Sequence, residues 1–158
     1  MKANDSIEIL LVEDDPADTR LIIELWNELE GTNINSVNKG IDAMDYLYNR
    51  NKYKNCKKPS LILLDLGLPM KNGFEVLKEI KTDDELKCIP VIVLTGATDN
   101  KDINKSYEIY ANACIVKPID FDEFKNYMRI FINFWFKIVT LPKATPRRTK
   151  FDFKRLRK

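Results

Sequence analysis

The stretch SLILLDLGLPMKNG, residues 60–73, carries the clearest fold signal in the chain. It begins with an apolar run, Leu61–Leu66, that has the length and composition of a strand buried on both faces, as in a parallel sheet. Asp65 places a carboxylate near the end of that run, and glycine and proline residues typical of a turn follow it. The charge is explained if Asp65 stands where the strand emerges at the edge of the sheet.

Four other segments have the character of strands, and helical patterns lie between them. The other predicted strands are Ile7–Val12, Asn33–Val37, Pro90–Thr95 and Ala113–Lys117. The first predicted helix begins at Pro16, with Asp15 as its N-cap. The other predicted helices are Ile41–Tyr48, Gly73–Lys81, Asp99–Tyr110 and Phe121–Val139. Strand–helix alternation repeated in this way predicts an α/β fold, with a doubly wound parallel sheet of five strands and helices on both faces.

Length and composition limit the number of domains. The 158 residues, 44% apolar and 32% charged, suffice for one globular domain with a sizeable core and leave no room for a second catalytic domain. No positively charged leader with an apolar core opens the chain. The longest late apolar stretch, Ile130–Phe136, is far shorter than the ~20 residues that span a bilayer. We therefore expect a cytoplasmic protein without a membrane span.

The residue types that are missing restrict the chemistry. The sequence contains no histidine, which excludes Ser-His-Asp and Cys-His nucleophile activation and every imidazole metal site. The three cysteines, Cys56, Cys88 and Cys114, form no C-x-x-C pair, so neither a disulfide framework nor a thiolate zinc site is indicated. Any chemistry must therefore use carboxylates, hydroxyls, amines and the backbone.

The formal net charge of +2 conceals a division of the chain. Residues 143–158 carry eight basic residues and one acidic residue, whereas residues 1–142 carry 18 basic and 23 acidic residues. We expect a mildly acidic domain over residues 1–142 and a flexible basic tail over residues 143–158. Such a tail is typical of a disordered, solvated segment, but it also suits contact with nucleic acid, with an acidic membrane surface or with the acidic domain of a neighbouring subunit.

Carboxylates follow two of the predicted strands. Glu13 and Asp14 come directly after Ile7–Val12, and Asp65 stands at the end of the third strand. In a doubly wound sheet of order 2-1-3-4-5 these strands are neighbours, and their carboxyl ends flank the point where ligands bind. Converging carboxylates repel one another, which raises pKa values or recruits a cation. Oxygen ligands of this kind suit Mg2+ best, with Mn2+ and Ca2+ as substitutes.

Two more strand ends carry polar groups that suit a phosphate. Thr95 ends the predicted fourth strand and Lys117 ends the fifth. Singly, each polar residue has a structural explanation, since Asp15 can cap a helix and a strand-terminal Asp commonly forms a turn. The combination of carboxylates, a hydroxyl and an ammonium at four strand ends favours a phosphate-binding site.

Four motifs together carry a family resemblance. LLVEDDPADTR, LILLDLGLPMKNG, VIVLTGA and IVKP resemble, in order and separation, the receiver domain of two-component response regulators. The resemblance covers about Ile7 to Phe136 and implies the flavodoxin-like receiver fold with sheet order 2-1-3-4-5. The ending FINFWFKIVTLPK further resembles the stand-alone receivers of the phytochrome-associated type, which lack a DNA-binding output domain.

The resemblance implies a role for each residue at the metal. Asp65 matches the phosphoacceptor, and Asp14 matches the principal Mg2+ ligand. Glu13 matches the second member of the acidic pair, which acts directly or through metal-bound water. Gly67 matches the residue that offers its backbone carbonyl to the metal.

The resemblance also implies which residues contact the phosphoryl group. Thr95 matches the hydroxyl that contacts it, and Lys117 matches the ammonium that pairs with its oxygens. The Lys117–Pro118 peptide resembles one that is cis in the family. The family usually places an aromatic residue three positions before the lysine, where this chain has Cys114, so we expect a different readout of phosphorylation.

The implied function is that of a signalling phosphoacceptor. A sensor histidine kinase would supply both the phosphoryl group and the histidine that this chain lacks, and the receiver would be no enzyme, although it assists its own phosphotransfer and dephosphorylation. One alternative is a receiver whose basic tail contacts DNA or RNA. Another is a Mg2+-dependent phosphohydrolase on a related fold, which normally has a second acid two residues after the nucleophile, where this chain has Gly67.

The last predicted helix carries more apolar surface than one face of a sheet needs. One stripe comprises Phe124, Tyr127, Met128, Phe131, Ile132 and Trp135, and a second comprises Ile130, Phe134 and Phe136. The width predicts an interface, in a homodimer formed through this helix and the C-terminal extension or with another protein. The alternative is that an ordered segment such as Val139–Pro142 covers the helix.

Overall fold

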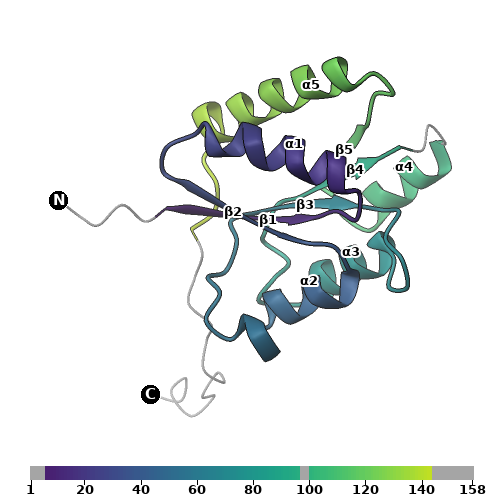
Figure 1. The fold of residues 1–158 in the computed structure, drawn as a ribbon. Coiled ribbons are helices and arrows are strands. Elements are labelled where there is room, and N and C mark those ends of the chain that lie inside the picture. The colour runs from purple at the N-terminus through teal and green to yellow at the C-terminus, as the bar shows by residue number, and fades with distance from the viewer. Residues whose placement is uncertain (1–5, 97–99, 144–158) are drawn as a thin grey trace, which may run out of the picture.

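In the part of the chain that the structure describes, five parallel strands form one sheet in the order β2-β1-β3-β4-β5 (Figure 1). The computed structural model describes residues 6–96 and 100–143. The strands are β1 (Ile7–Val12), β2 (Thr32–Val37), β3 (Leu61–Asp65), β4 (Val91–Thr95) and β5 (Ala113–Val116). This architecture confirms the predicted fold class and sheet order, and it makes β1 and β3 neighbours.

Five α-helices of the described residues surround the sheet. They are α1 (Pro16–Asn27), α2 (Gly40–Leu47), α3 (Gly73–Thr82), α4 (Asn100–Glu108) and α5 (Phe121–Asn133). In Figure 1, α1 and α5 cover one face of the sheet, and α2 and α3 cover the other. A short 3-10 helix, η1 (Asn51–Tyr53), follows α2, and a π-helical segment, η2 (Phe134–Ile138), continues α5. None of the described helices has both the length and the apolar character needed to cross a bilayer.

Side-chain caps start three of the helices where the sequence supplies an Asp or Asn. The Asp15 carboxylate accepts hydrogen bonds from the N–H groups of Ala17 and Asp18, which confirms the predicted N-cap of α1. Asn72 caps α3 and Asp120 caps α5 in the same way. Each cap satisfies backbone N–H groups that the first helical turn leaves without partners.

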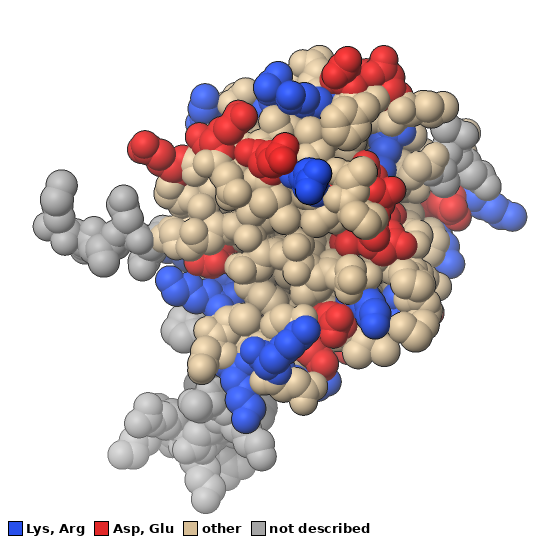
Figure 2. Space-filling model, viewed as in Figure 1, with Lys and Arg blue, Asp and Glu red and all other residues tan. Residues whose placement is uncertain are grey.

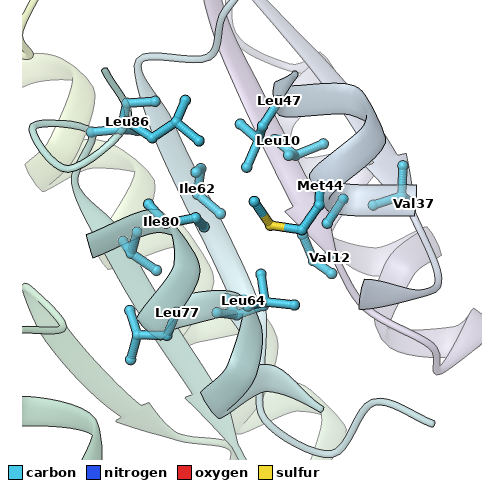
Figure 3. Close-up of a cluster of buried hydrophobic side chains, with 14 of the residues drawn as sticks. Leu10, Val12, Val37, Met44, Leu47, Ile62, Leu64, Leu77, Ile80 and Leu86 are labelled. Carbon is cyan, nitrogen blue, oxygen red and sulfur yellow. The ribbon is translucent and has the colours of Figure 1, made fainter. Parts of the chain in front are cut away.

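The core lies in two layers, one on each face of the sheet. Successive residues of a strand point to opposite faces, so Leu10 and Val12 pack on one side while Ile9 and Leu11 pack on the other. Figure 3 shows the layer under α2 and α3, where Met44 lies between the sheet and α2 and Leu77 projects from α3. Burial on both faces explains why β3 and β4 are apolar runs up to their last residue.

The end of α5 differs from the predicted continuous helix. The chain widens into the π-helical η2, with the Val139 N–H donating to the Phe134 carbonyl. The widening alters the directions of the side chains that follow, and the ring of Phe136 meets that of Trp26 edge-on, with 5.0 Å between centroids. Phe136 therefore does not extend the exposed stripe as predicted. Leu141 packs against the same layer, so part of the predicted covering by the C-terminal segment is present.

Of the predicted domain and the predicted basic tail, the structure describes mainly the domain. The structure describes the chain up to Lys143, and the rest of the predicted basic tail, residues 144–158, lies outside the described residues.

Candidate functional site

The predicted site residues lie at the carboxyl edge of the sheet. Glu13 follows β1, Asp65 ends β3, Thr95 ends β4 and Lys117 follows β5. The Lys117 N–H donates to the Thr95 carbonyl at 2.7 Å, which aligns the ends of the two strands. Acidic side chains gather at the right of Figure 2, on the side where the strands end in Figure 1.

Three carboxylates converge at this edge. Glu13, Asp14 and Asp65 each offer an oxygen, and these oxygens all lie within 4.8 Å of one another. Glu13 is 1% exposed and Asp65 8% exposed, whereas Asp14 is exposed. Hard oxygen donors at such spacing, two of them buried and one open to solvent, fit Mg2+ or Mn2+, which keep several water ligands.

The ammonium of Lys117 sits among three carboxylates. Its Nζ lies 2.6 Å from Glu13 Oε2, 3.1 Å from Asp18 Oδ2 and 3.4 Å from Asp65 Oδ2. These bonds connect the end of β5 to β1, to α1 and to β3. The Lys117 ammonium therefore links three acidic side chains at the carboxyl edge of the sheet.

Asp18 is a carboxylate partner of Lys117 that the strand-end pattern does not reveal. It lies in the first turn of α1, three residues beyond the N-cap Asp15, with which it shares the run EDDPAD. The signal available in the sequence was the position of Asp18 in the predicted helix, one turn after the strand-end acid Asp14. Its contact with Lys117 spans 99 residues of sequence, so local patterns alone do not predict it.

The buried carboxyls of Glu13 and Asp65 have opposite pKa shifts. Burial, and next the hydrogen bond to Asp65, raise the pKa of Glu13 to about 8. Burial also opposes ionisation of Asp65, but hydrogen bonds from Glu13, from the Gly67 N–H and from Lys117 outweigh it and lower the Asp65 pKa. Of the two groups, Asp65 therefore ionises first, and a nucleophile must be in that form.

The Lys117 ammonium stays charged in this setting. Burial of the side chain works against the charge, but the hydrogen bond and charge of Glu13, with those of the neighbouring carboxylates, outweigh burial and raise the Lys117 pKa. A permanent cation beside Asp65 is suited to pairing with an anionic group there.

The turn after β3 is built around Asp65. The Gly67 N–H donates to Asp65 Oδ1 at 2.9 Å and fixes the direction of the carboxylate. The Gly73 N–H donates to the Leu66 carbonyl, which folds the start of α3 back against the strand end. A methyl group added at Gly73 would lie 2.4 Å from the Asp65 carbonyl oxygen, so only glycine fits this position.

Two details around Lys117 differ from the family pattern. The Lys117–Pro118 peptide is trans, contrary to the expectation of a cis bond, because the trans isomer is favoured by about 0.5–1 kcal/mol and already lets the ammonium reach the carboxylates. Cys114 takes the place of the usual aromatic residue, and its N–H donates to the hydroxyl of Tyr107 at 3.1 Å. An aromatic side chain from α4 thus contacts the backbone at this position.

The chain is similar in sequence to known proteins. The response regulator receiver domain family matches residues 9–129 of the chain. Response regulator Rcp1 of Synechocystis sp. is 41% identical over 140 residues, which cover 86% of this chain and 93% of that protein. Probable methanogenesis regulatory protein FilR2 of Methanothrix harundinacea is 35% identical over 136 residues, which cover 85% of this chain and 87% of that protein.

Solved structures extend the similarity to three dimensions. The crystal structure of the Mn2+-bound form of Rcp1 has a TM-score of 0.84 and 39% sequence identity, and the match covers 87% of this chain and 99% of that one. The crystal structure of the phosphorylated cyanobacterial phytochrome response regulator RcpA also has a TM-score of 0.84, with 40% identity and the same coverage of both chains.

Proposed function

The chain belongs to the response regulator receiver family, and on this premise we propose that it is a stand-alone receiver that accepts a phosphoryl group on Asp65 from a sensor histidine kinase. The observation that carries the proposal is the position of Asp65, whose carboxylate lies 3.4 Å from the Lys117 ammonium and beside Glu13 and Asp14. The crystal structure of the similar RcpA in its phosphorylated form supports the same reaction class.

The reaction transfers a phosphoryl group from a histidine nitrogen of the kinase to a carboxylate oxygen of Asp65. An Asp65 carboxylate oxygen attacks phosphorus, the P–O bond forms, and the P–N bond to the kinase histidine breaks, with the nitrogen keeping the electron pair and taking up a proton. An anion that attacks an anion needs charge neutralisation and alignment rather than a base, which agrees with the absence of histidine. Lys117 would pair with a phosphoryl oxygen, and the Thr95 hydroxyl would donate to another.

A divalent cation completes the proposed site. Glu13, Asp14, Asp65 and the Gly67 carbonyl would hold Mg2+, with Mn2+ as a substitute, and the ion would supply charge neutralisation at the phosphoryl oxygens. The three convergent carboxylate oxygens support this assignment, as does the Mn2+-bound form of the similar Rcp1.

The phosphorylated state would be reversible and would serve signalling. We infer that the same groups assist attack of water on the phosphorylated Asp65, so that the receiver contributes to its own dephosphorylation. Because the kinase draws its phosphoryl group from ATP, we infer that the protein acts in the cytoplasm.

Intact-mass analysis after incubation with acetyl phosphate and Mg2+ tests the core of the proposal. We expect one phosphoryl adduct on the wild-type chain and none on Asp65→Asn, which keeps the size of the side chain but removes the nucleophile. No adduct on the wild-type chain under any metal condition would overturn the proposal.

Asp14 and Asp15 are adjacent in sequence, and replacing each in turn gives a matched test of the metal site. Asp14→Asn should weaken Mn2+ binding about tenfold or more, measured by electron paramagnetic resonance of the free ion, because it removes a charged oxygen ligand. Asp15→Asn should bind Mn2+ as the wild type does, because Asp15 caps α1 and the amide oxygen can still accept the capping hydrogen bonds. Equal loss in both variants would remove Asp14 from the proposed ligand set.

We propose that the output is self-association through the face of β5 and α5. A groove of about 770 Å³ runs along this face, and its lining includes Cys114, Tyr127, Ile130 and Phe134. The side chains of Tyr127, Ile130 and Phe134 are exposed. An apolar surface beside β5, the strand that Lys117 follows, is well situated to respond to phosphorylation, and a second copy of the chain presents an equally apolar face.

A further inference from the structure

Among the described residues, Asp18 is the carboxylate partner of Lys117 that lies outside the proposed metal site. Glu13 and Asp65 contribute oxygens to the acidic cluster, whereas Asp18 does not. Its carboxylate comes from the first turn of α1, on an element separate from the strand ends. The pair is largely enclosed, with side-chain exposures of 22% for Asp18 and 13% for Lys117.

The three carboxylate partners of the Lys117 ammonium differ in whether the metal ion or the phosphoryl group would also engage them. An ammonium has three N–H donors, and the Lys117 ammonium has three carboxylate partners. Metal binding would engage Glu13 and Asp65, and phosphorylation would engage Asp65 again. Neither event uses the oxygens of Asp18, so its bond to Lys117 can persist through both.

We propose that Asp18 is a positioning residue that holds the Lys117 ammonium in the crevice while Glu13 and Asp65 bind the metal ion and the phosphoryl group. This inference rests on the proposed function. The bond would keep one N–H on Asp18 and leave the others directed toward Asp65, where the phosphoryl oxygens arrive.

Three physical effects favour the positioning of the Lys117 ammonium by Asp18. A free lysine side chain has many rotamers, so an ammonium that is already held reaches the transition state with less loss of conformational entropy. The enclosed pair is also less screened than an ion pair on the surface. The support is rigid, because the Asp18 N–H donates to the capping carboxylate of Asp15 at 3.1 Å.

The rate of phosphorylation by acetyl phosphate at saturating Mg2+ tests the positioning role of Asp18. In this reaction Asp65 bonds to phosphorus while the bond between phosphorus and the acetate oxygen breaks, and acetate leaves with the electron pair. Asp18→Ala should slow adduct formation on the order of tenfold, because the ammonium loses its placement. Asp18→Asn should slow it less, because the amide oxygen still accepts one hydrogen bond from Lys117.

A double-mutant cycle separates positioning from a structural effect. In a Lys117→Gln background, Asp18→Ala should cause no further slowing of the residual reaction, because the group that it positions is gone. Mn2+ affinity should be unchanged in Asp18→Ala. Glu24→Ala removes an exposed charge from the same helix and should react at the wild-type rate.

The outcomes separate this inference from the proposed function. If the wild-type chain forms no adduct at Asp65, the proposed function fails and the inference fails with it. If the wild-type chain reacts and Asp18→Ala reacts equally fast or faster, or slows the reaction equally in the Lys117→Gln background, only the positioning role of Asp18 is overturned.

Discussion

Gly73 lies against the backbone of Asp65 so closely that a methyl group on Gly73 would sit 2.4 Å from the Asp65 carbonyl oxygen and 2.5 Å from the Leu66 Cα. The first residue of α3 is thereby packed onto the end of β3, directly behind the proposed phosphoacceptor. The turn that carries the carboxylate is held by backbone contacts as well as by the side-chain bonds of the site.

Gly73→Ala should therefore destabilise the protein. Both atoms that meet the new methyl group belong to the backbone and cannot rotate away, so we expect a loss of about 2–3 kcal/mol in the free energy of unfolding, measured by urea denaturation. Gly96→Ala is the control, because no atom of the described residues lies within 4 Å of a methyl group there. Equal stability of the two variants would show that the site of the new methyl group at Gly73 is not closed by the backbone of Asp65 and Leu66.

Stability without added metal should depend on pH through Glu13. Burial raises the Glu13 pKa from 4.5 to about 8, so between these values the folded state holds a proton that the unfolded state has lost. The free energy of unfolding should then decrease as pH rises through this window, by at most about 1.4 kcal/mol per pH unit. The lowered pKa of Asp65 makes the free energy of unfolding increase with pH, but this effect lies below the ordinary Asp65 pKa of 3.8 and so outside the window.

Glu13→Gln provides the comparison for this pH dependence. The amide does not titrate, so the decrease between pH 4.5 and 8 should flatten in denaturation curves recorded with a chelator present. A decline as steep as that of the wild type would assign the pH dependence to other groups.

Phe136→Ala should loosen the attachment of η2 to the core. The edge-on contact with Trp26 spans 5.0 Å between ring centroids, and its loss should cost about 1–2 kcal/mol in the free energy of unfolding. In a Trp135→Phe background, Trp26 is the remaining tryptophan, and its fluorescence should shift to longer wavelength as solvent enters. Phe134→Ala, at a side chain 47% exposed, should leave that emission unchanged.

Ile130→Glu should prevent the proposed self-association without unfolding the protein. Ile130 is 61% exposed, so a charge there costs little in the monomer but would be buried without a partner in an interface. We expect size-exclusion chromatography with beryllofluoride and Mg2+ to show a dimer of the wild type and a monomer of Ile130→Glu.

The matching control for the interface lies on the other side of the sheet. Ile41 in α2 is 51% exposed, and Ile41→Glu should dimerise as the wild type does. If both glutamate variants dimerised, another surface would be responsible.

Much of the fold could be predicted because its signals are local. The apolar runs of β3 and β4 indicate burial on both faces, and Asp15 with Pro16 marks the start of α1 within a few residues. Most predicted element bounds differ from the observed ones by one or two residues. The exception is the end of α5, where packing of Phe136 against Trp26, which is distant in sequence, accompanies a switch to π-helical geometry.

The convergence of the site was predictable for a related reason. Parallel strands bring their carboxyl ends to one edge, so residues that end strands must be neighbours whatever the details of packing. That rule brings Glu13, Asp65 and Lys117 together. It does not apply to Asp18, which stands on a helix and reaches Lys117 only because α1 packs with its first turn over that edge.

The sequence by itself determined the elements, their alternation and the identity of the groups at the strand ends, because each follows from hydrophobic pattern, capping and chain connectivity. Tertiary structure decided which carboxylates share the Lys117 ammonium and which of the buried acids Glu13 and Asp65 ionises first. These properties depend on distances of a few ångströms between segments far apart in the chain, and on how much water the packed fold leaves around each charge.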